Sequence, residues 1–243
     1  MADTPSLLHV ENVDLEIDGR DILKGINISS NAARVAVLGR NGSGKSTLAR
    51  VIAGLQLPDR GRVHVAGVDV AGDRRGALGA VGILFQNPDH QIIFPTVHEE
   101  LGFGLGQMGL GKAETALWVQ EILARFGKEG WHDAAVHRLS QGQRQLVCLM
   151  SILVMRPEVI ILDEPFSGLD IPTMLHLTRV LATVDAALIH ITHDPRMIAS
   201  YDHALWIEQG SIAQQGAADV VVEAYLRAMH ELGARDDLTD IAS

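Results

Sequence analysis

A glycine-rich segment with the sequence GRNGSGKST, residues 39–47, contains the residue types that hold a nucleotide phosphate. It matches the pattern G-x-x-x-x-G-K-[ST] and lies between a short apolar run and a predicted helix, the local context that this pattern requires. Glycines let consecutive backbone N–H groups converge on a phosphate, with the helix dipole behind them. A glycine-rich turn with a surface lysine is the alternative, but it does not explain the strand, loop and helix in register. We therefore predict a phosphate site made of Gly39, Asn41, Gly42, Ser43, Gly44, Lys45, Ser46 and Thr47.

Within this loop, Lys45 and Ser46 have the clearest chemical roles. We expect the Lys45 ammonium to reach the β- and γ-phosphate oxygens, and the Ser46 hydroxyl to ligate Mg²⁺. Two adjacent acids, Asp163 and Glu164, follow the apolar run at residues 159–162. Because side chains alternate along a strand, we expect the two carboxylates to diverge and take different roles. Asp163 would hold the Mg²⁺ shell, and Glu164 would polarise the attacking water. A charged turn at a strand end is common, so this pair gains its meaning from the phosphate loop that precedes it.

The segment LSQGQ, residues 139–143, resembles the signature LSGGQ of the ABC ATPases, with Gln141 in place of the usual glycine. A serine and a glycine at a helix N-terminus can bind an anion, although an ordinary serine N-cap has the same sequence. The resemblance covers nearly the whole chain. It implies that Ser140, Gly142 and Gln143 bind the γ-phosphate of ATP held by a second ABC ATPase subunit, either a second copy or a paralogue. The predicted cofactors are ATP and Mg²⁺.

Other segments resemble further motifs of the same family. Gln86 resembles the glutamine that contacts Mg²⁺ or water, and His193 resembles the histidine that contacts the γ-phosphate. The segment SGLD, residues 167–170, resembles the loop that crosses the dimer interface. At the position where the family usually stacks an aromatic ring on adenine, this chain has Ile17, which can pack on a purine but cannot stack as an aromatic ring does. The resemblance thus assigns catalysis to Lys45, Gln86, Glu164 and His193, and the metal to Ser46, Gln86 and Asp163.

The segment FQNPDHQIIFPTVHEELGFG, residues 85–104, resembles the energy-coupling-factor (ECF) importers of vitamins and metal ions. That resemblance implies two membrane partners, a transmembrane coupling component and a substrate-binding subunit, and a peripheral location on the cytoplasmic face of the cell membrane. Glu99 and Glu100 would then meet arginines of the coupling component, or else lie on an exposed helical face. Residues 144–173 further resemble the ATPases of biotin-specific ECF importers. We expect biotin as the solute, with cobalt, nickel or another vitamin as alternatives.

The elements that must position these residues alternate between strands and helices, which is typical of an α/β fold with a largely parallel sheet. The resemblance makes this fold a P-loop NTPase, with a RecA-like core, an N-terminal antiparallel β-subdomain and an inserted helical subdomain. We predict a single domain over residues 1–232, the helical insertion at about 88–155, and a loose acidic tail at 233–243. Strands are expected at 10–17, 22–29, 34–38, 63–65, 81–85, 159–162 and 188–191, a hairpin at 206–212, and helices at 45–53, 112–126, 141–155 and 219–232.

Composition narrows the class of protein. A formal net charge of −10 argues against nucleic acid as a partner. The single cysteine, Cys148, cannot form an internal disulfide, and no apolar run is long enough to cross a bilayer. A non-transport ABC ATPase is one alternative, but chromosome and repair types carry a long coiled coil, and the residues between Gln86 and Leu139 hold no sustained heptads. A small-molecule kinase is another, but it leaves the signature segment unexplained.

Overall fold

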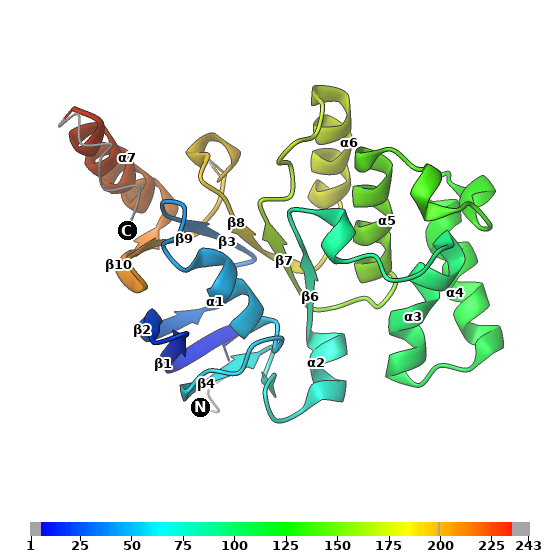
Figure 1. The fold of residues 1–243 in the computed structure, drawn as a ribbon, viewed down its shortest axis with the longest axis horizontal. Helices are drawn as coiled ribbons and strands as arrows, with labels where there is room; N and C mark the ends of the chain where they lie inside the picture. The colour runs from blue at the N-terminus through cyan, green and yellow to red at the C-terminus, as the bar shows by residue number, and fades with distance from the viewer. Residues whose placement is uncertain (1–5, 199, 235–243) are drawn as a thin grey trace.

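The computed structural model describes residues 6–198 and 200–234, and it contains two β-sheets (Figure 1). The smaller sheet is antiparallel with the strand order β2-β1-β4-β5. Its first two strands form a hairpin that turns through Asp18 and Gly19, both with positive φ, as a tight two-residue turn requires. This sheet is the predicted N-terminal antiparallel subdomain. Its strands are β1 (Leu8–Ile17), β2 (Arg20–Ser30), β4 (Arg60–Val65) and β5 (Val68–Asp69).

The larger sheet has the order β10-β9-β3-β8-β7-β6, and its five neighbouring strands from β9 to β6 are parallel. Only β10 runs antiparallel, as the second strand of the predicted hairpin. This arrangement confirms the predicted α/β fold of the P-loop NTPases. The strands are β3 (Arg34–Leu38), β6 (Val81–Leu84), β7 (Val159–Asp163), β8 (Ala187–Ile191), β9 (His203–Glu208) and β10 (Ser211–Ala217).

Helices cover both faces of the larger sheet, and a helical subdomain formed by α3, α4 and α5 lies at the opposite end of the molecule from α7 (Figure 1). The helices predicted from the sequence are α1, α4, α5 and α7, each found within about two residues of its expected bounds. Three further helices have no predicted bounds: α3 lies within the predicted helical insertion, whereas α2 and α6 are not predicted from the sequence. The helices are α1 (Lys45–Ile52), α2 (Arg74–Ala80), α3 (Val97–Met108), α4 (Lys112–Arg125), α5 (Gln141–Leu153), α6 (Ile171–Ala182) and α7 (Ala218–Ala234).

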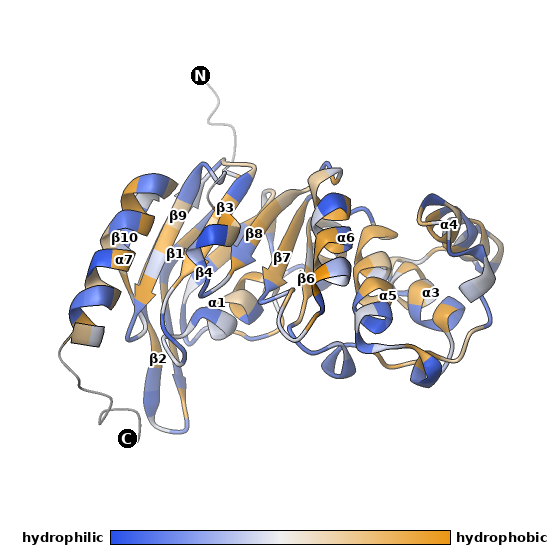
Figure 2. Ribbon diagram, turned by 90° about the horizontal axis from the view of Figure 1, so that it is seen from above, coloured by the Kyte–Doolittle hydropathy of each residue, from blue (hydrophilic) through white to orange (hydrophobic). Residues whose placement is uncertain are grey.

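The alternation of side chains along β7 divides the core into two layers. Val159 and Ile161 pack with α1 and the small sheet, whereas Ile160 and Leu162 pack with α3, α4 and α5. Strands β7 and β8 are hydrophobic along most of their length (Figure 2), because both of their faces are covered by other elements. The helical insertion therefore shares one core with the sheet that carries the phosphate loop.

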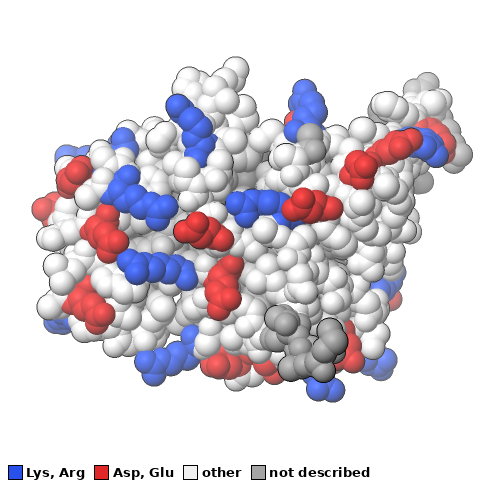
Figure 3. Space-filling model, turned by 180° about the vertical axis from the view of Figure 1, so that it is seen from behind, with Lys and Arg blue, Asp and Glu red and all other residues white. Residues whose placement is uncertain are grey.

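Three observations concern the surface and the ends of the chain. Acidic and basic side chains are interspersed on the face seen in Figure 3. Over residues 6–198 and 200–234, none of the helices combines the length and the apolar character that a bilayer crossing needs. Of the predicted loose tail, residues 233 and 234 belong to α7, and residues 235–243 lie outside the described part of the chain.

Candidate functional site

The phosphate loop connects β3 to α1 and is held against the hairpin of β9 and β10. At Gly39, a Cβ atom would lie 2.3 Å from the carbonyl oxygen of Ile207, so no side chain fits there. Gly44, immediately before α1, has φ 103°, which favours glycine. The Gly210 N–H also donates to the carbonyl oxygen of Ser43 at 3.1 Å. The glycines of the motif are therefore required by close backbone approach and by the path of the loop.

Lys45 is buried inside its own loop. Its Nζ donates to the carbonyl oxygens of Gly39 and Arg40, both at 2.8 Å. Burial lowers the pKa of Lys45, while the carboxylates of Glu164 and Asp163 oppose that change. Two neutral carbonyl groups replace the hydration shell of this ammonium, so the free energy of removing its charge from water is only partly recovered. The site therefore favours an anionic ligand beside Lys45.

Asp163, the last residue of β7, lies next to Ser46 at the start of α1. The Ser46 hydroxyl donates to Oδ1 of Asp163 at 3.1 Å. Burial raises the pKa of Asp163, and the Ser46 hydrogen bond acts in the other direction. A buried carboxylate beside a hydroxyl is an oxygen donor set of the kind that Mg²⁺ prefers. Ser46 and Asp163, two of the three predicted metal ligands, thus lie in contact and fit the ion.

Glu164 follows the strand but does not continue its geometry. Its φ is +49°, a left-handed conformation that is unusual for a residue other than glycine. The direction of the Glu164 side chain therefore depends on this backbone turn as well as on the strand alternation that the sequence suggested. The Nδ1 of His193 donates to Oε1 of Glu164 at 2.8 Å, and the Glu164 side chain is 16% exposed against 64% for His193. Strained backbone of this kind is commonly retained at functional sites.

Lys45, Ser46, Glu164 and His193 line one open cavity of about 630 Å³, whereas Asp163 lies behind the lining residue Ser46, to which it is hydrogen-bonded. Gln86 also lines the cavity, and its Nε2 donates to the hydroxyl of Ser167 at 3.0 Å. The structure thus brings the phosphate loop together with the candidate metal, water and sensor residues. The cavity is lined by Ile22, Asn41, Gly42, Gly44, Lys45, Ser46, Thr47, Gln86, Glu164, Ser167 and His193.

The predicted adenine-contact residue, Ile17, lies apart from this lining. It is the last residue of β1, it is 39% exposed, and it pairs with Arg20 across the hairpin. Ile22, on the next strand, lines the cavity instead. A signal for Ile22 was present in the sequence, since it is the apolar residue that follows the turn. Ile17 stays a predicted adenine contact, although it is not among the residues that line the cavity.

The signature residues occupy the N-terminus of α5. Ser140 is the N-cap: its Oγ accepts from the backbone N–H of Gln143 at 3.3 Å, and the Gln143 side chain accepts from the Ser140 N–H at 2.9 Å. Gly142 lies against α6, where a Cβ atom would be 2.6 Å from Cγ2 of Thr173. Among the residues described, none of these three signature residues lines the cavity that holds Lys45. The structure thus separates the signature from the phosphate loop of the same chain.

A second cavity of about 460 Å³ runs between the helical subdomain, the segment that follows α1, and the elements α2 and β6. Its lining is largely apolar and includes Phe85, Ile93 and Phe103, of which Ile93 is 69% exposed. Glu100, expected either to meet arginines or to lie on an exposed face, is buried here. Its carboxylate accepts the backbone N–H groups of Ile93 and Phe94, both at 2.9 Å. Glu100 therefore fixes the loop beside this groove, and it is Glu99 that remains exposed.

Known proteins resemble the chain in sequence and in structure. The biotin transport ATP-binding protein BioM of Rhodobacter capsulatus is 47% identical over 93% of this chain and 96% of the relative. The energy-coupling factor transporter ATP-binding protein EcfA of Methanocaldococcus jannaschii is 37% identical over 85% of this chain and 78% of the relative. CbiO1 of Clostridium perfringens, part of the ABC transporter complex CbiONQ, superposes with a TM-score of 0.75 and 32% identity, covering 95% of this chain and 96% of that chain.

The match to a protein family extends over more of the chain than any single motif. The ABC transporter family matches residues 23–167, a range that includes the phosphate loop, the signature and both strand-end acids. That range is more than half of the 243 residues. With this match and the 47% identity to BioM, the chain belongs to the ABC transporter family.

Proposed function

We propose that this chain is the ATP-hydrolysing subunit of an ECF-type importer and energises biotin uptake through a separate transmembrane component. In this proposal it works at the cytoplasmic face of the cell membrane, together with a substrate-binding membrane subunit. The observation that carries the ATPase part is the convergence of Lys45, Ser46, Glu164 and His193 around one cavity. The ECF and biotin parts rest on the likeness to EcfA and BioM.

ATP would bind with its phosphates in the loop at Gly39–Thr47. Lys45 would exchange its two carbonyl partners for the β- and γ-phosphate oxygens, which compensate its charge better. Ser46, Asp163 and Gln86 would hold a Mg²⁺ ion, which when bound neutralises charge on the phosphates. Gln86 must first give up its hydrogen bond to Ser167.

Glu164 is the candidate general base. Its carboxylate faces the cavity, where it can accept a proton from a water molecule positioned beside the γ-phosphate. The hydrogen bond from His193 orients that carboxylate in the nucleotide-free chain. On nucleotide binding, His193 is well placed to turn its ring toward the phosphate, because most of its side chain is exposed.

A complete site would need a second ABC ATPase subunit. Ser140, Gly142 and Gln143 present a helix N-terminus and backbone N–H groups, which suit an anion. Since they lie outside the cavity of their own chain, their ligand would be the γ-phosphate bound by the partner subunit. The partner would be a second copy of this chain or a paralogue.

The apolar groove between α2, α3 and α5 supports docking of a transmembrane component. Exposed side chains such as Ile93 and Phe103 form an apolar surface that an amphipathic helix could cover. The solute itself would cross the membrane through the partners. Its identity is therefore proposed from the relatives alone.

Uptake of labelled biotin tests the proposal. In a strain lacking this chain and related ATPases, the wild-type chain together with its membrane partners should restore uptake, and Lys45→Ala should not. Lys112→Ala is the matched control, because Lys112 is exposed at the start of α4 and lies outside both the cavity and the groove.

Three outcomes have distinct meanings. Restored cobalt, nickel or other vitamin uptake without biotin uptake would remove biotin alone. Failure of the chain to sediment with membranes in the presence of its partners would favour a non-transport ATPase. Full activity of Lys45→Ala would contradict the assignment of the phosphate loop.

A further inference from the structure

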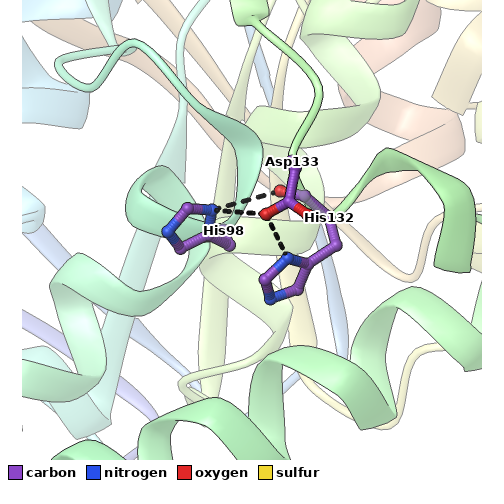
Figure 4. Close-up of side chains that lie close together, drawn as sticks. All are labelled: His98, His132 and Asp133. Carbon is purple, nitrogen blue, oxygen red and sulfur yellow. Dashed lines mark hydrogen bonds and ion pairs between the residues drawn. The ribbon is translucent and has the colours of Figure 1, made fainter.

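Two histidines and an aspartate from separate parts of the helical subdomain meet at its surface (Figure 4). His98 lies in the first turn of α3, whereas His132 and Asp133 follow a short 3₁₀ helix at Glu129–Trp131. The Nδ1 of His132 is 2.7 Å from Oδ1 of Asp133, and the Nδ1 of His98 is 3.7 Å from the same oxygen. One ligand atom from each residue lies within 4.8 Å of the other two.

The backbone holds these two segments together. The His98 N–H donates to the carbonyl oxygen of His132 at 3.1 Å, and the Val97 N–H donates to that of Ala134 at 3.1 Å. Beyond them, Thr96 and Ala135 form an isolated antiparallel bridge. The three side chains therefore project from a small, hydrogen-bonded framework. Such support reduces the entropy that a ligand site loses on binding.

The nucleotide site and the partner groove do not account for this cluster. None of its three residues lines the cavity around Lys45 or the groove at Phe103, among the described residues. His98 and His132 instead line a separate cavity of about 300 Å³ between α3 and α4. That space can admit water, which commonly completes the coordination sphere of a metal ion.

We propose that His98, His132 and Asp133 form a binding site for a divalent transition-metal ion of the zinc class. Two imidazole nitrogens and a carboxylate oxygen are the donor set that Zn²⁺ and similar ions accept, and three protein ligands leave a position for water. The Nδ1 atoms are the donors, since both lie beside the carboxylate. In the metal-free chain, His98 Nδ1 lies 3.2 Å from the His132 carbonyl oxygen, a distance that suits an N–H···O hydrogen bond. A metal ion at Nδ1 would displace the proton of that hydrogen bond.

The present ring geometry sets a limit on the affinity. The two imidazoles are stacked, with centroids 4.7 Å apart and planes only 4° from parallel. A metal ion binds an imidazole in the plane of its ring, and two parallel planes do not meet. At least one ring must therefore turn about its side-chain torsions. Both histidine side chains are 39% exposed, so the turn is not blocked, and we expect a site of moderate affinity.

Calorimetric titration of Zn²⁺ into the full chain tests this site. The protein should be free of an affinity tag and of nucleotide, and excess Mg²⁺ should be present to compete for the carboxylates of the phosphate site. We expect one equivalent of zinc to bind with micromolar affinity, and His132→Gln or Asp133→Asn to weaken it at least about tenfold. Asp133 is 86% exposed, so Asp133→Asn should fold normally. Zinc should also raise the melting temperature of the wild type more than that of these variants.

Two control variants make the result specific. His137→Gln removes an exposed histidine a few residues away and should bind zinc as the wild type does. His193→Gln removes the other histidine–carboxylate pair, at Glu164, and should also leave binding unchanged. The proposal is overturned if the wild type shows no saturable zinc binding, if the cluster variants bind as well as the wild type, or if only His193→Gln weakens binding.

Discussion

Replacing Ser140 by aspartate would separate its role in the fold from its proposed role at a nucleotide. In the structure, Ser140 caps α5 through a reciprocal pair of hydrogen bonds with Gln143. Aspartate caps a helix about as well as serine, whereas alanine costs about 1 kcal/mol. Ser140→Asp should therefore unfold at the wild-type temperature. Ser140→Ala should melt about 2–4 °C lower, as that loss predicts for a domain of this size.

The effect of Ser140→Asp on ATP should be large if Ser140 faces a γ-phosphate. A carboxylate about 4 Å from one negative charge costs roughly 4 kcal/mol at an effective dielectric constant near 20. Since about 1.4 kcal/mol corresponds to a factor of ten, each shared site should weaken roughly a thousandfold, and a dimer of this variant carries the loss at both sites. Ser140→Ala should weaken it far less, because it introduces no charge. Ser140→Asp should thus be the more stable variant but the weaker one in ATP-induced dimerisation, and Ser140→Ala the reverse.

Mixed dimers then test which chain supplies each group. Lys45→Ala and Ser140→Asp should each abolish ATP occlusion alone. In a mixed dimer of these two variants one site carries both lesions and the other is intact. Mixing should restore about one occluded ATP per dimer, against about two for the wild type. A double variant mixed with wild type has one lesion in each site, so it should occlude none. Carrying Glu164→Gln in every chain keeps the bound ATP from being hydrolysed during the measurement.

The opposite pattern would refute the reasoning. If Lys45 and Ser140 served the same nucleotide within one chain, mixing the single variants would restore nothing. The wild-type subunit beside a double variant would then keep its own ATP. If instead Ser140→Asp dimerised with ATP as the wild type does, the only role of Ser140 would be to cap α5.

Three further predictions concern single side chains. Glu164→Gln should lower ATP turnover at least about a hundredfold while ATP still binds, whereas Glu158→Gln, an exposed acid before the same strand, should not; near-normal turnover would show that Glu164 is misassigned. Burial raises the pKa of Asp163, so its ionised form destabilises the nucleotide-free fold. Asp163→Asn should therefore raise the melting temperature at pH 7.5. The increase should shrink as the pH falls toward 3.8, the ordinary pKa of an aspartate. An unchanged melting temperature at pH 7.5 would contradict this reasoning. Burial lowers the pKa of His190 from 6.5 to about 4, so stability present above pH 6.5 is lost as the pH falls toward 4. Between pH 7.5 and 5, urea unfolding of the wild type should lose about 2 kcal/mol more than that of His190→Leu, and equal losses would show that His190 is not held neutral.

The phosphate loop could be predicted from the sequence because its signal is local. Its glycines, its lysine and the neighbouring strand and helix are all within a short stretch, and the geometry of the loop follows from that stretch. Asp163 could be predicted for a related reason: it ends an apolar strand of a parallel sheet, and such ends gather at one edge. For the phosphate loop and Asp163, the neighbouring sequence alone therefore determines where the side chains lie.

The helices α2 and α6, which were not predicted, differ in the strength of their sequence signal. α6 begins after Asp170, which caps it, and has a proline at its second position, so its start was visible in the sequence. α2 contains Gly76 and Gly79 within seven residues, and glycine disfavours a helix interior. Asp73 accepts the N–H of Gly76 at 2.8 Å, so capping and packing outweigh that cost.

Three features of the structure could not be predicted from the local sequence pattern. Burial of Glu100 depends on the loop at Ile93, which folds back over the first turn of α3. The left-handed turn at Glu164 has no sequence signature, since glutamate rarely adopts it. His98 and His132 belong to different elements, and only the backbone pairing between them brings their rings together.

One buried side chain connects the groove, the nucleotide cavity and the signature helix. Gln145 lies in α5, is 1% exposed, and donates through Nε2 to the carbonyl oxygens of Phe85 at 3.1 Å and Pro165 at 3.4 Å. Phe85 lines the groove and its neighbour Gln86 lines the cavity, while Pro165 directly follows Glu164. Leaving a buried amide unpaired costs about 1–3 kcal/mol. A movement that keeps both hydrogen bonds of Gln145 therefore costs less free energy than one that separates the segments at Phe85 and Pro165. A partner that displaces Phe85 would therefore also act on the backbone next to Glu164, which lines the cavity, and this gives coupling between groove and cavity a physical basis.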